Sequence, residues 1–177
     1  NGPGVNALRT ISAAVAKAVD GDVINIASGT YTLGTYSFSK NISLVGESAP
    51  NRPIINFGSS GPYWLQVSSA ITVDFENLIF DGSGKSAASA IFFYANSSGT
   101  INNCEIKNDI EYGIYNRGGT VYVLDTTMQN VGRTGCYARD DSETIIKNLQ
   151  YTGKGAGDRL DYAIEIRDNA RVDVQDS

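Results

Sequence analysis

Aromatic and arginine side chains recur at a fixed spacing in the second half of the chain, and both residue types bind sugars. Four short segments each open on a small residue, and two of them end on tyrosine, any residue and arginine. The segments are 90–94, 113–117, 135–139 and 163–167. Arginine can hold a carboxylate or sulfate through two parallel hydrogen bonds, and aromatic rings pack on the apolar faces of sugars. Together they predict a surface for an acidic glycan, provided that the four segments lie side by side.

A second pattern supports that arrangement, because an apolar residue is followed two places later by Asn or Asp at regular intervals. From position 77 to positions 103, 125, 148 and 176 the intervals are 26, 22, 23 and 28 residues. A period of this length is typical of a repeat in which each unit stacks on the next. The repeat positions are Asn77, Asn103, Asp125, Asn148 and Asp176.

The same register predicts which side chains face outward. If Ile91, Ile114, Cys136 and Ile164 stack inside the molecule, strand alternation places the next residue of each segment on the surface. One face then carries an outward column of Phe92, Tyr115, Tyr137 and Glu165 beside a column of Tyr94, Arg117, Arg139 and Arg167.

The elements that must hold these columns are short strands. Apolar residues at helical spacing predict one amphipathic helix over 8–19. Strands are predicted over 22–26, 42–45 and 54–57, and a turn is predicted over 27–31. From residue 64 onward the rhythm is three strands per coil. Such strands bury their apolar faces only by stacking, so the chain is predicted to be a single all-β domain over 1–177, a solenoid of about six coils whose first edge is covered by the helix.

Composition excludes several classes of function. The 14 basic and 19 acidic residues give a net charge of −5, which disfavours nucleic-acid binding. No apolar run is long enough to insert in a membrane. The sequence contains no histidine, which rules out catalytic triads and histidine-ligated zinc. Cys104 and Cys136 lack metal-ligand spacing; both are expected in the core, although a disulfide between them stays possible if their Cα atoms lie within about 7 Å.

The N-terminal segments resemble the pectin-lyase-like superfamily of right-handed parallel β-helices. The resemblance is carried by 13–18, 20–26, 29–31 and 41–47, and the later coils match the weaker pattern of an apolar residue, any residue and Asn. It implies a right-handed parallel β-helix, and it implies that the repeated Asn and Asp side chains turn inward and stack as a ladder. In catalytic members, the strands equivalent to the four segments border the substrate groove. The superfamily includes lyases, esterases, glycosidases, adhesins and structural modules, so the fold implies no single activity.

Two interpretations of the charged residues remain open. For a calcium-dependent polysaccharide lyase, the candidate bases are Arg139, Arg167 and Lys154, and the candidate calcium ligands are Asp140, Asp141 and Asp168. The alternative is a surface ladder in which the arginines pair with those same aspartates. A glycine-rich loop over 152–161 adds Arg159 to the candidate ligand-binding residues.

The sequence therefore predicts a secreted or cell-surface module for adhesion or assembly, whose aromatic and arginine face binds an acidic polysaccharide or a neighbouring chain. It predicts no cofactor, apart from calcium if the chain is a lyase. The alternatives are a calcium-dependent lyase and a subunit that stacks end to end through an uncapped last coil, which another chain or further residues would complete. Asn41 and Asn96 begin N-glycosylation sequons, which fit an extracellular setting.

Overall fold

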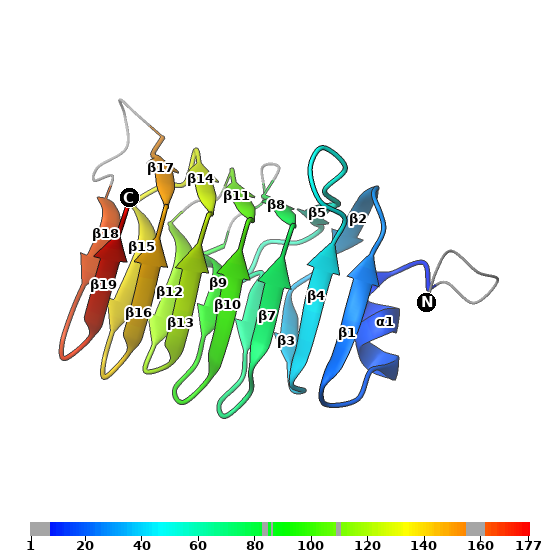
Figure 1. The fold of residues 1–177 in the computed structure, drawn as a ribbon, viewed down its shortest axis with the longest axis horizontal. Coiled ribbons are helices and arrows are strands. Elements are labelled where there is room, and N and C mark those ends of the chain that lie inside the picture. The colour runs from blue at the N-terminus through cyan, green and yellow to red at the C-terminus, as the bar shows by residue number, and fades with distance from the viewer. Residues whose placement is uncertain (1–7, 83–84, 86, 109–110, 155–161) are drawn as a thin grey trace.

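The chain folds into a right-handed parallel β-helix, as predicted. The computed structural model describes residues 8–82, 85, 87–108, 111–154 and 162–177. Figure 1 shows the coils advancing from helix α1 (Ile11–Lys17) at one end to the C-terminal strand at the other. About six turns of chain stack in this way, and each full turn contributes one strand to each of three sheets.

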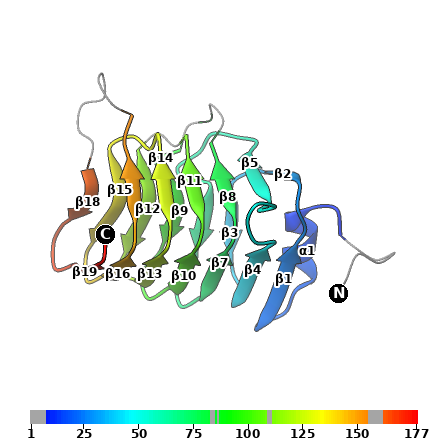
Figure 2. The same cartoon turned by 45° about the horizontal axis from the view of Figure 1, so that its top comes forward.

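The three sheets run along the solenoid, and all the strand pairings in them are parallel (Figure 2). Sheet A contains β1 (Asp22–Ile26), β4 (Ile42–Gly46), β7 (Val73–Glu76), β10 (Ser98–Asn102), β13 (Thr120–Leu124), β16 (Glu143–Lys147) and β19 (Arg171–Gln175). Sheet B contains β2 (Thr30–Leu33), β5 (Ile54–Phe57), β8 (Ile79–Asp81), β11 (Glu105–Lys107), β14 (Thr127–Gln129) and β17 (Gln150–Thr152). Sheet C contains β3 (Tyr36–Phe38), β6 (Leu65–Val67), β9 (Ser89–Phe93), β12 (Tyr112–Arg117), β15 (Thr134–Arg139) and β18 (Tyr162–Ile166).

The core is built from one column of apolar side chains per inward strand position. In sheet C the predicted column is confirmed, because Ile91 pairs with Ile114, Ile114 with Cys136, and Cys136 with Ile164. Leu65 extends the same column toward the helix. Stacking coils in register pairs each inner strand on both sides and buries its apolar face, which no single coil could do.

The first coil differs from its prediction in two respects. Helix α1 is shorter than 8–19: Thr10 caps it by accepting a hydrogen bond from Ala13 N, and Lys40 Nζ donates to three carbonyls near its C-terminal end. The apolar residues at both predicted ends, Leu8 and Val19, are exposed. Residues 27–31 do not form only a turn, because strand β2 begins at Thr30 and alternates polar and apolar residues against β5.

The repeated Asn and Asp residues lie at the bend between sheets A and B, where each adopts a positive φ of 47–57°. Asn and Asp tolerate this left-handed conformation better than other residues with a side chain. They stack as predicted in two places, where Asn103 donates to Asn77 and Asn148 donates to Asp125. The inward orientation was wrong: these side chains are partly or fully exposed, and after the first four of them the next residue enters the core. Those core residues are Leu78, Cys104, Thr126 and Leu149.

Candidate functional site

The outward face of sheet C carries the aromatic column in the predicted register. Phe92 lies opposite Tyr115, Tyr115 opposite Tyr137, and Tyr137 opposite Glu165. Arg117 lies opposite Arg139 at the ends of β12 and β15. The long strands of sheet C therefore bring together side chains that are separated by more than 20 residues in the sequence.

The aromatic rings form a continuous strip along the solenoid. The centroids of Phe92 and Tyr115 are 4.8 Å apart, as are those of Tyr115 and Tyr137, with tilted ring planes. Tyr94 packs edge-on against Phe92 at 5.5 Å and remains 40% exposed. Neighbouring rings at these distances and angles stabilise one another, so the strip is held rigidly on the sheet. The aromatic strip consists of Tyr63, Phe92, Tyr94, Tyr112, Tyr115 and Tyr137.

Two members of the aromatic strip were missed from the sequence. Tyr63 precedes β6 and stacks on Phe92 at 6.2 Å, and Tyr112 stacks on Tyr137 at 4.8 Å. Strict alternation from Ile114 would turn Tyr112 inward. Gly113 breaks the alternation, because it also faces the core: a Cβ there would lie 2.9 Å from the sulfur of buried Met128. The small residue at the start of each repeated segment could have indicated this break in the alternation.

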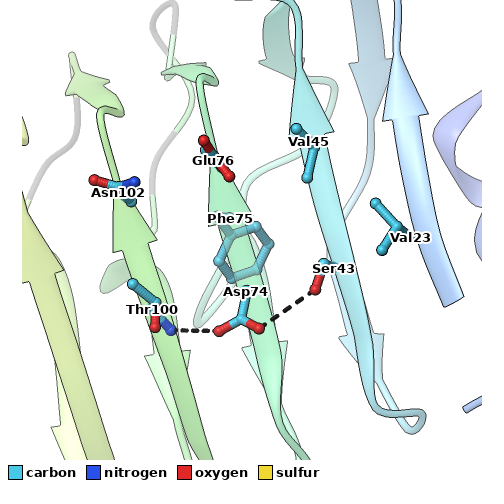
Figure 3. A pocket seen from close by; sticks show the side chains of 8 residues that line it. All are labelled: Val23, Ser43, Val45, Asp74, Phe75, Glu76, Thr100 and Asn102. Carbon is cyan, nitrogen blue, oxygen red and sulfur yellow. Dashed lines mark hydrogen bonds between the residues drawn. The ribbon is translucent and has the colours of Figure 1, made fainter. Parts of the chain in front are cut away.

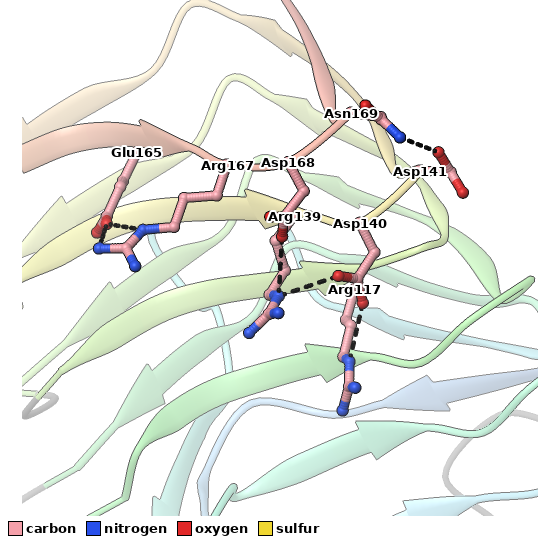
Figure 4. Close-up of polar contacts among 8 residues, drawn as sticks. All are labelled: Arg117, Arg139, Asp140, Asp141, Glu165, Arg167, Asp168 and Asn169. Atoms are coloured by element: carbon pink, nitrogen blue, oxygen red, sulfur yellow. Dashed lines mark hydrogen bonds and ion pairs between the residues drawn. The ribbon is translucent and has the colours of Figure 1, made fainter.

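The arginines form a ladder of ion pairs where sheet C bends toward sheet A (Figure 4). Asp140 accepts from Arg117 Nε at 3.0 Å with one carboxylate oxygen and from Arg139 Nε at 3.2 Å with the other. Arg139 Nε also lies 3.4 Å from Asp168. Asp140 and Asp168 have positive φ angles, as does Gly118, so all three are bend residues that directly follow an arginine. Arg117, Asp140, Arg139 and Asp168 are the ion-pair ladder, and Arg167 pairs separately with Glu165 at 2.8 Å.

These contacts shift the pKa values of the charged groups. Hydrogen bonds from Arg117 and Arg139 lower the pKa of the Asp140 carboxyl. Hydrogen bonding to Tyr115 and to Asp140 raises the pKa of the Arg139 guanidinium, and Glu165 does the same for Arg167. The guanidinium groups of Arg139 and Arg167 and the Asp140 carboxylate are thus held in their charged forms.

The predicted calcium ligands do not fit a calcium ion. The carboxylates of Asp140 and Asp168 contact arginines, whereas Asp141 accepts from the Asn169 amide at 3.2 Å. Calcium needs six to eight oxygen ligands, roughly, gathered without competing cations. Within the described residues, no three Asp, Glu, Cys or His side chains are placed to hold a metal ion.

The remaining predicted site residues are Lys154, Arg159, Asn96 and Asn41. Arg159 is outside them, and Lys154 is exposed after β17. Asn96 is exposed in the bend after β9, with a φ of 61°. Asn41 accepts from Thr72 N at 2.8 Å and donates to Asp20 at 3.4 Å, so its amide is already engaged.

Both cysteines are buried free thiols. Cys136 lies in the sheet C column, and Cys104 follows the bend between sheets A and B. Burial raises the pKa of each thiol to about 12, although backbone hydrogen bonds at Cys104 act in the opposite direction. They act as small apolar core residues.

Two shallow depressions lie elsewhere on the surface. The first has a volume of about 330 Å³ on the outer face of sheet A, where Ser43 Oγ and Thr100 N donate to Asp74 (Figure 3). The second, of about 360 Å³, is lined by residues 141–143, Asn169 and Arg171. Neither includes a residue of the aromatic strip. The candidate site on sheet C is therefore an open face, distinct from both depressions.

No helix among the described residues has the length and hydropathy needed to cross a lipid bilayer.

This chain is similar to several solved structures. A structure described as a candidate glycosyl hydrolase from Parabacteroides merdae aligns with a TM-score of 0.62 at 10% identity, over 86% of this chain and 78% of that one. A pectin methylesterase from Aspergillus niger aligns with a TM-score of 0.43 at 14% identity, over 95% and 88% of the two chains. Pectate lyase Pel9A aligns with a TM-score of 0.42 at 16% identity, over 94% and 58%.

Identities this low bear on the fold alone, and the parallel β-helix implied by the resemblance to the pectin-lyase-like superfamily is the observed architecture. The search of curated proteins gave no match. A family model described as a domain of unknown function, DUF4957, matches residues 29–155, which is most of the solenoid. This chain belongs to the DUF4957 family.

Proposed function

We propose that this chain is a non-catalytic, extracellular module for adhesion or assembly that binds a polysaccharide on the outward face of sheet C. The observation that carries the proposal is the aromatic strip, whose central rings lie 4.8 Å apart on three successive strands. Aromatic rings pack against the apolar faces of sugars, and neighbouring guanidinium groups donate hydrogen bonds to hydroxyl groups. Phe92, Tyr94 and Tyr115 are at least partly exposed, and they supply both kinds of contact together with the arginines beside them. The rings of Tyr112 and Tyr137 are only 8% and 6% exposed, so they support the neighbouring rings from beneath.

The charge states favour binding over lyase chemistry. A general base must lose its proton before it can accept one from a substrate. The raised pKa values of Arg139 and Arg167 make that loss harder than for a free arginine. The solved structure that aligns with a TM-score of 0.62 is described as a candidate glycosyl hydrolase, and that description supports a carbohydrate ligand. Exposed Asn96 in its sequon supports an extracellular setting.

The test compares two tyrosines of similar exposure on different faces. Tyr94 belongs to the aromatic strip and is 40% exposed, whereas Tyr122 lies on sheet A and is 43% exposed. Binding to a panel of soluble polysaccharides is measured by affinity electrophoresis and then by calorimetry. Tyr94→Ala should weaken binding about tenfold, equivalent to about 1.4 kcal/mol, and Tyr122→Ala should leave it unchanged.

Three results would overturn the proposal: no polysaccharide binding above background, equal losses in both variants, or catalysis. Catalysis is followed as the absorbance of unsaturated products from oligogalacturonate with calcium present. Product formation that disappears in Arg139→Ala would replace the binding module with a lyase.

A further inference from the structure

Three arginines beside the aromatic strip contact carboxylates of the chain itself, and a fourth, Arg133, lies over the Tyr112 ring at 5.4 Å. Arg117 and Arg139 share Asp140, Arg139 also contacts Asp168, and Arg167 contacts Glu165. Three guanidinium groups and three carboxylates thus leave this part of the face without net charge. A ligand meets a row of alternating charges there, rather than a positive patch.

The part of the row around Arg117 combines three kinds of contact at one place. The guanidinium carbon of Arg117 lies 6.0 Å from the centroid of the Tyr94 ring. Arg117 contacts Asp140 through Nε, which leaves its two Nη groups available to donate. The side chain of Asp140 is 38% exposed, so its oxygens can still accept. An apolar ring face, a donor and an acceptor side by side match a sugar ring with hydroxyl groups.

We infer that the sheet C face selects uncharged polysaccharides and rejects uronate chains. The inference rests on the proposed function and narrows its ligand class, in place of the acidic glycan expected from the sequence. A uronate carboxylate that binds the available Nη groups of Arg117 must lie beside the Asp140 carboxylate, which the backbone holds in place at the bend. The two carboxylates would then repel each other at close range. A neutral sugar gains donor and acceptor contacts without displacing any ion pair.

The first experiment uses the unaltered protein and two probes, a neutral soluble β-glucan panel and polygalacturonate. Binding to a neutral glycan is expected, with affinity changing less than about twofold between about 0.05 and about 0.5 M NaCl, because no net charge is exchanged. Binding to polygalacturonate alone, weakening steeply with salt, overturns this inference and leaves the proposed function standing. Binding to neither probe nor to the wider panel overturns the proposed function, and this inference with it.

The second experiment removes the negative charge that pairs with Arg117 and Arg139. Asp140→Asn keeps an acceptor oxygen and a residue that tolerates the left-handed bend, but it removes one negative charge. It should strengthen polygalacturonate binding by roughly tenfold or more while neutral binding changes little. Asp141→Asn is the matched control, because Asp141 contacts the Asn169 amide and, among the described residues, forms no ion pair with Arg117 or Arg139. It removes the same charge one residue away and should gain nothing.

Equal gains in both variants would show that overall charge, and not the ion-pair ladder, excludes uronates, and would overturn the inference. The comparison on the unaltered protein needs no substitution, so the inference remains testable even if Asp140→Asn fails to fold.

Discussion

Asn116 is a polar side chain inside the solenoid, and its replacement tests whether the bend that carries Arg117 is held from within. The residue is 1% exposed and occupies a core position opposite Phe93 on one neighbouring strand and Ala138 on the other. Its amide nitrogen donates to Gly119 O, Glu143 O and Thr144 Oγ1 at 2.9–3.1 Å. Its amide oxygen accepts from Gly119 N at 3.0 Å.

These contacts give an estimate of the loss in Asn116→Ala. Each buried polar group left without a partner costs about 1–3 kcal/mol. If two of the four partners stay unpaired after the amide is removed, the free energy of unfolding falls by about 2–6 kcal/mol. That is a large fraction of the roughly 5–15 kcal/mol that stabilises a typical domain. Because the contacts reach Glu143 on the next coil, the substitution should also loosen Arg117 and weaken binding on sheet C.

Urea denaturation measures the loss, followed by circular dichroism and by the fluorescence of the single, fully buried Trp64. Coincident transitions are required, because a solenoid can unfold in parts. Asn25→Ala is the matched control on the exposed side of β1 and should change stability by no more than about 0.5 kcal/mol. A loss below about 1 kcal/mol in Asn116→Ala would refute the reasoning, since it would mean that its partners find others or are hydrated.

Three further predictions follow from the same structure. The pKa of Asp140 is lower in the folded protein than in the unfolded chain, so its ion pairs stabilise the fold above the ordinary aspartate pKa of about 4, and this stabilisation is lost as the pH falls through the lowered pKa. The difference in Tm between wild type and Asp140→Asn should therefore vanish in acid. A difference that stays constant with pH would contradict this prediction. Cys104 and Cys136, with pKa values of about 12, should react with iodoacetamide at pH 8 on the order of a thousandfold more slowly than in urea; rapid native labelling, read by mass spectrometry, would disprove their burial. Gly99→Ala would press a Cβ against the backbone carbonyl of Val73 on the neighbouring strand β7 and should lower the free energy of unfolding, measured in urea, by about 2 kcal/mol. Gly34→Ala is the control, because a Cβ there would make only an ordinary contact with Ser59 Oγ at 3.6 Å.

The columns of sheet C were predictable because two independent periods agree there. Alternation within each segment separated inward Ile91 from outward Phe92, and the longer period aligned each segment with the next. The pairing of Ile91 with Ile114 and of Phe92 with Tyr115 confirms both. The first coil was harder, because Gly29 before Thr30 suggested a turn, while the alternation of Tyr31 and Leu33 in β2 was the better signal.

The sequence alone could not predict which carboxylates pair with the arginines of sheet C. The sequence offered Asp140, Asp141 and Asp168 equally as partners for arginine or calcium, whereas the fold separates Asp141 from the arginines. Position at the bend determines which of these aspartates contact an arginine. A residue directly after the arginine takes a left-handed φ, as Gly118 does on the preceding coil, and its side chain returns toward the guanidinium groups.

Strand length explains why sheet C carries the candidate site and sheet B does not. Strands β12 and β15 contain six residues each, whereas β11 and β14 contain three. Strand β12 turns three side chains outward, Tyr112, Tyr115 and Arg117, whereas a three-residue strand has room for only two. Along a strand the recognition surface ends after a few positions, but along the solenoid it repeats with every coil, about 4.8 Å apart. A linear glycan that contacts several rings of the aromatic strip must therefore lie along the solenoid axis, crossing the strands.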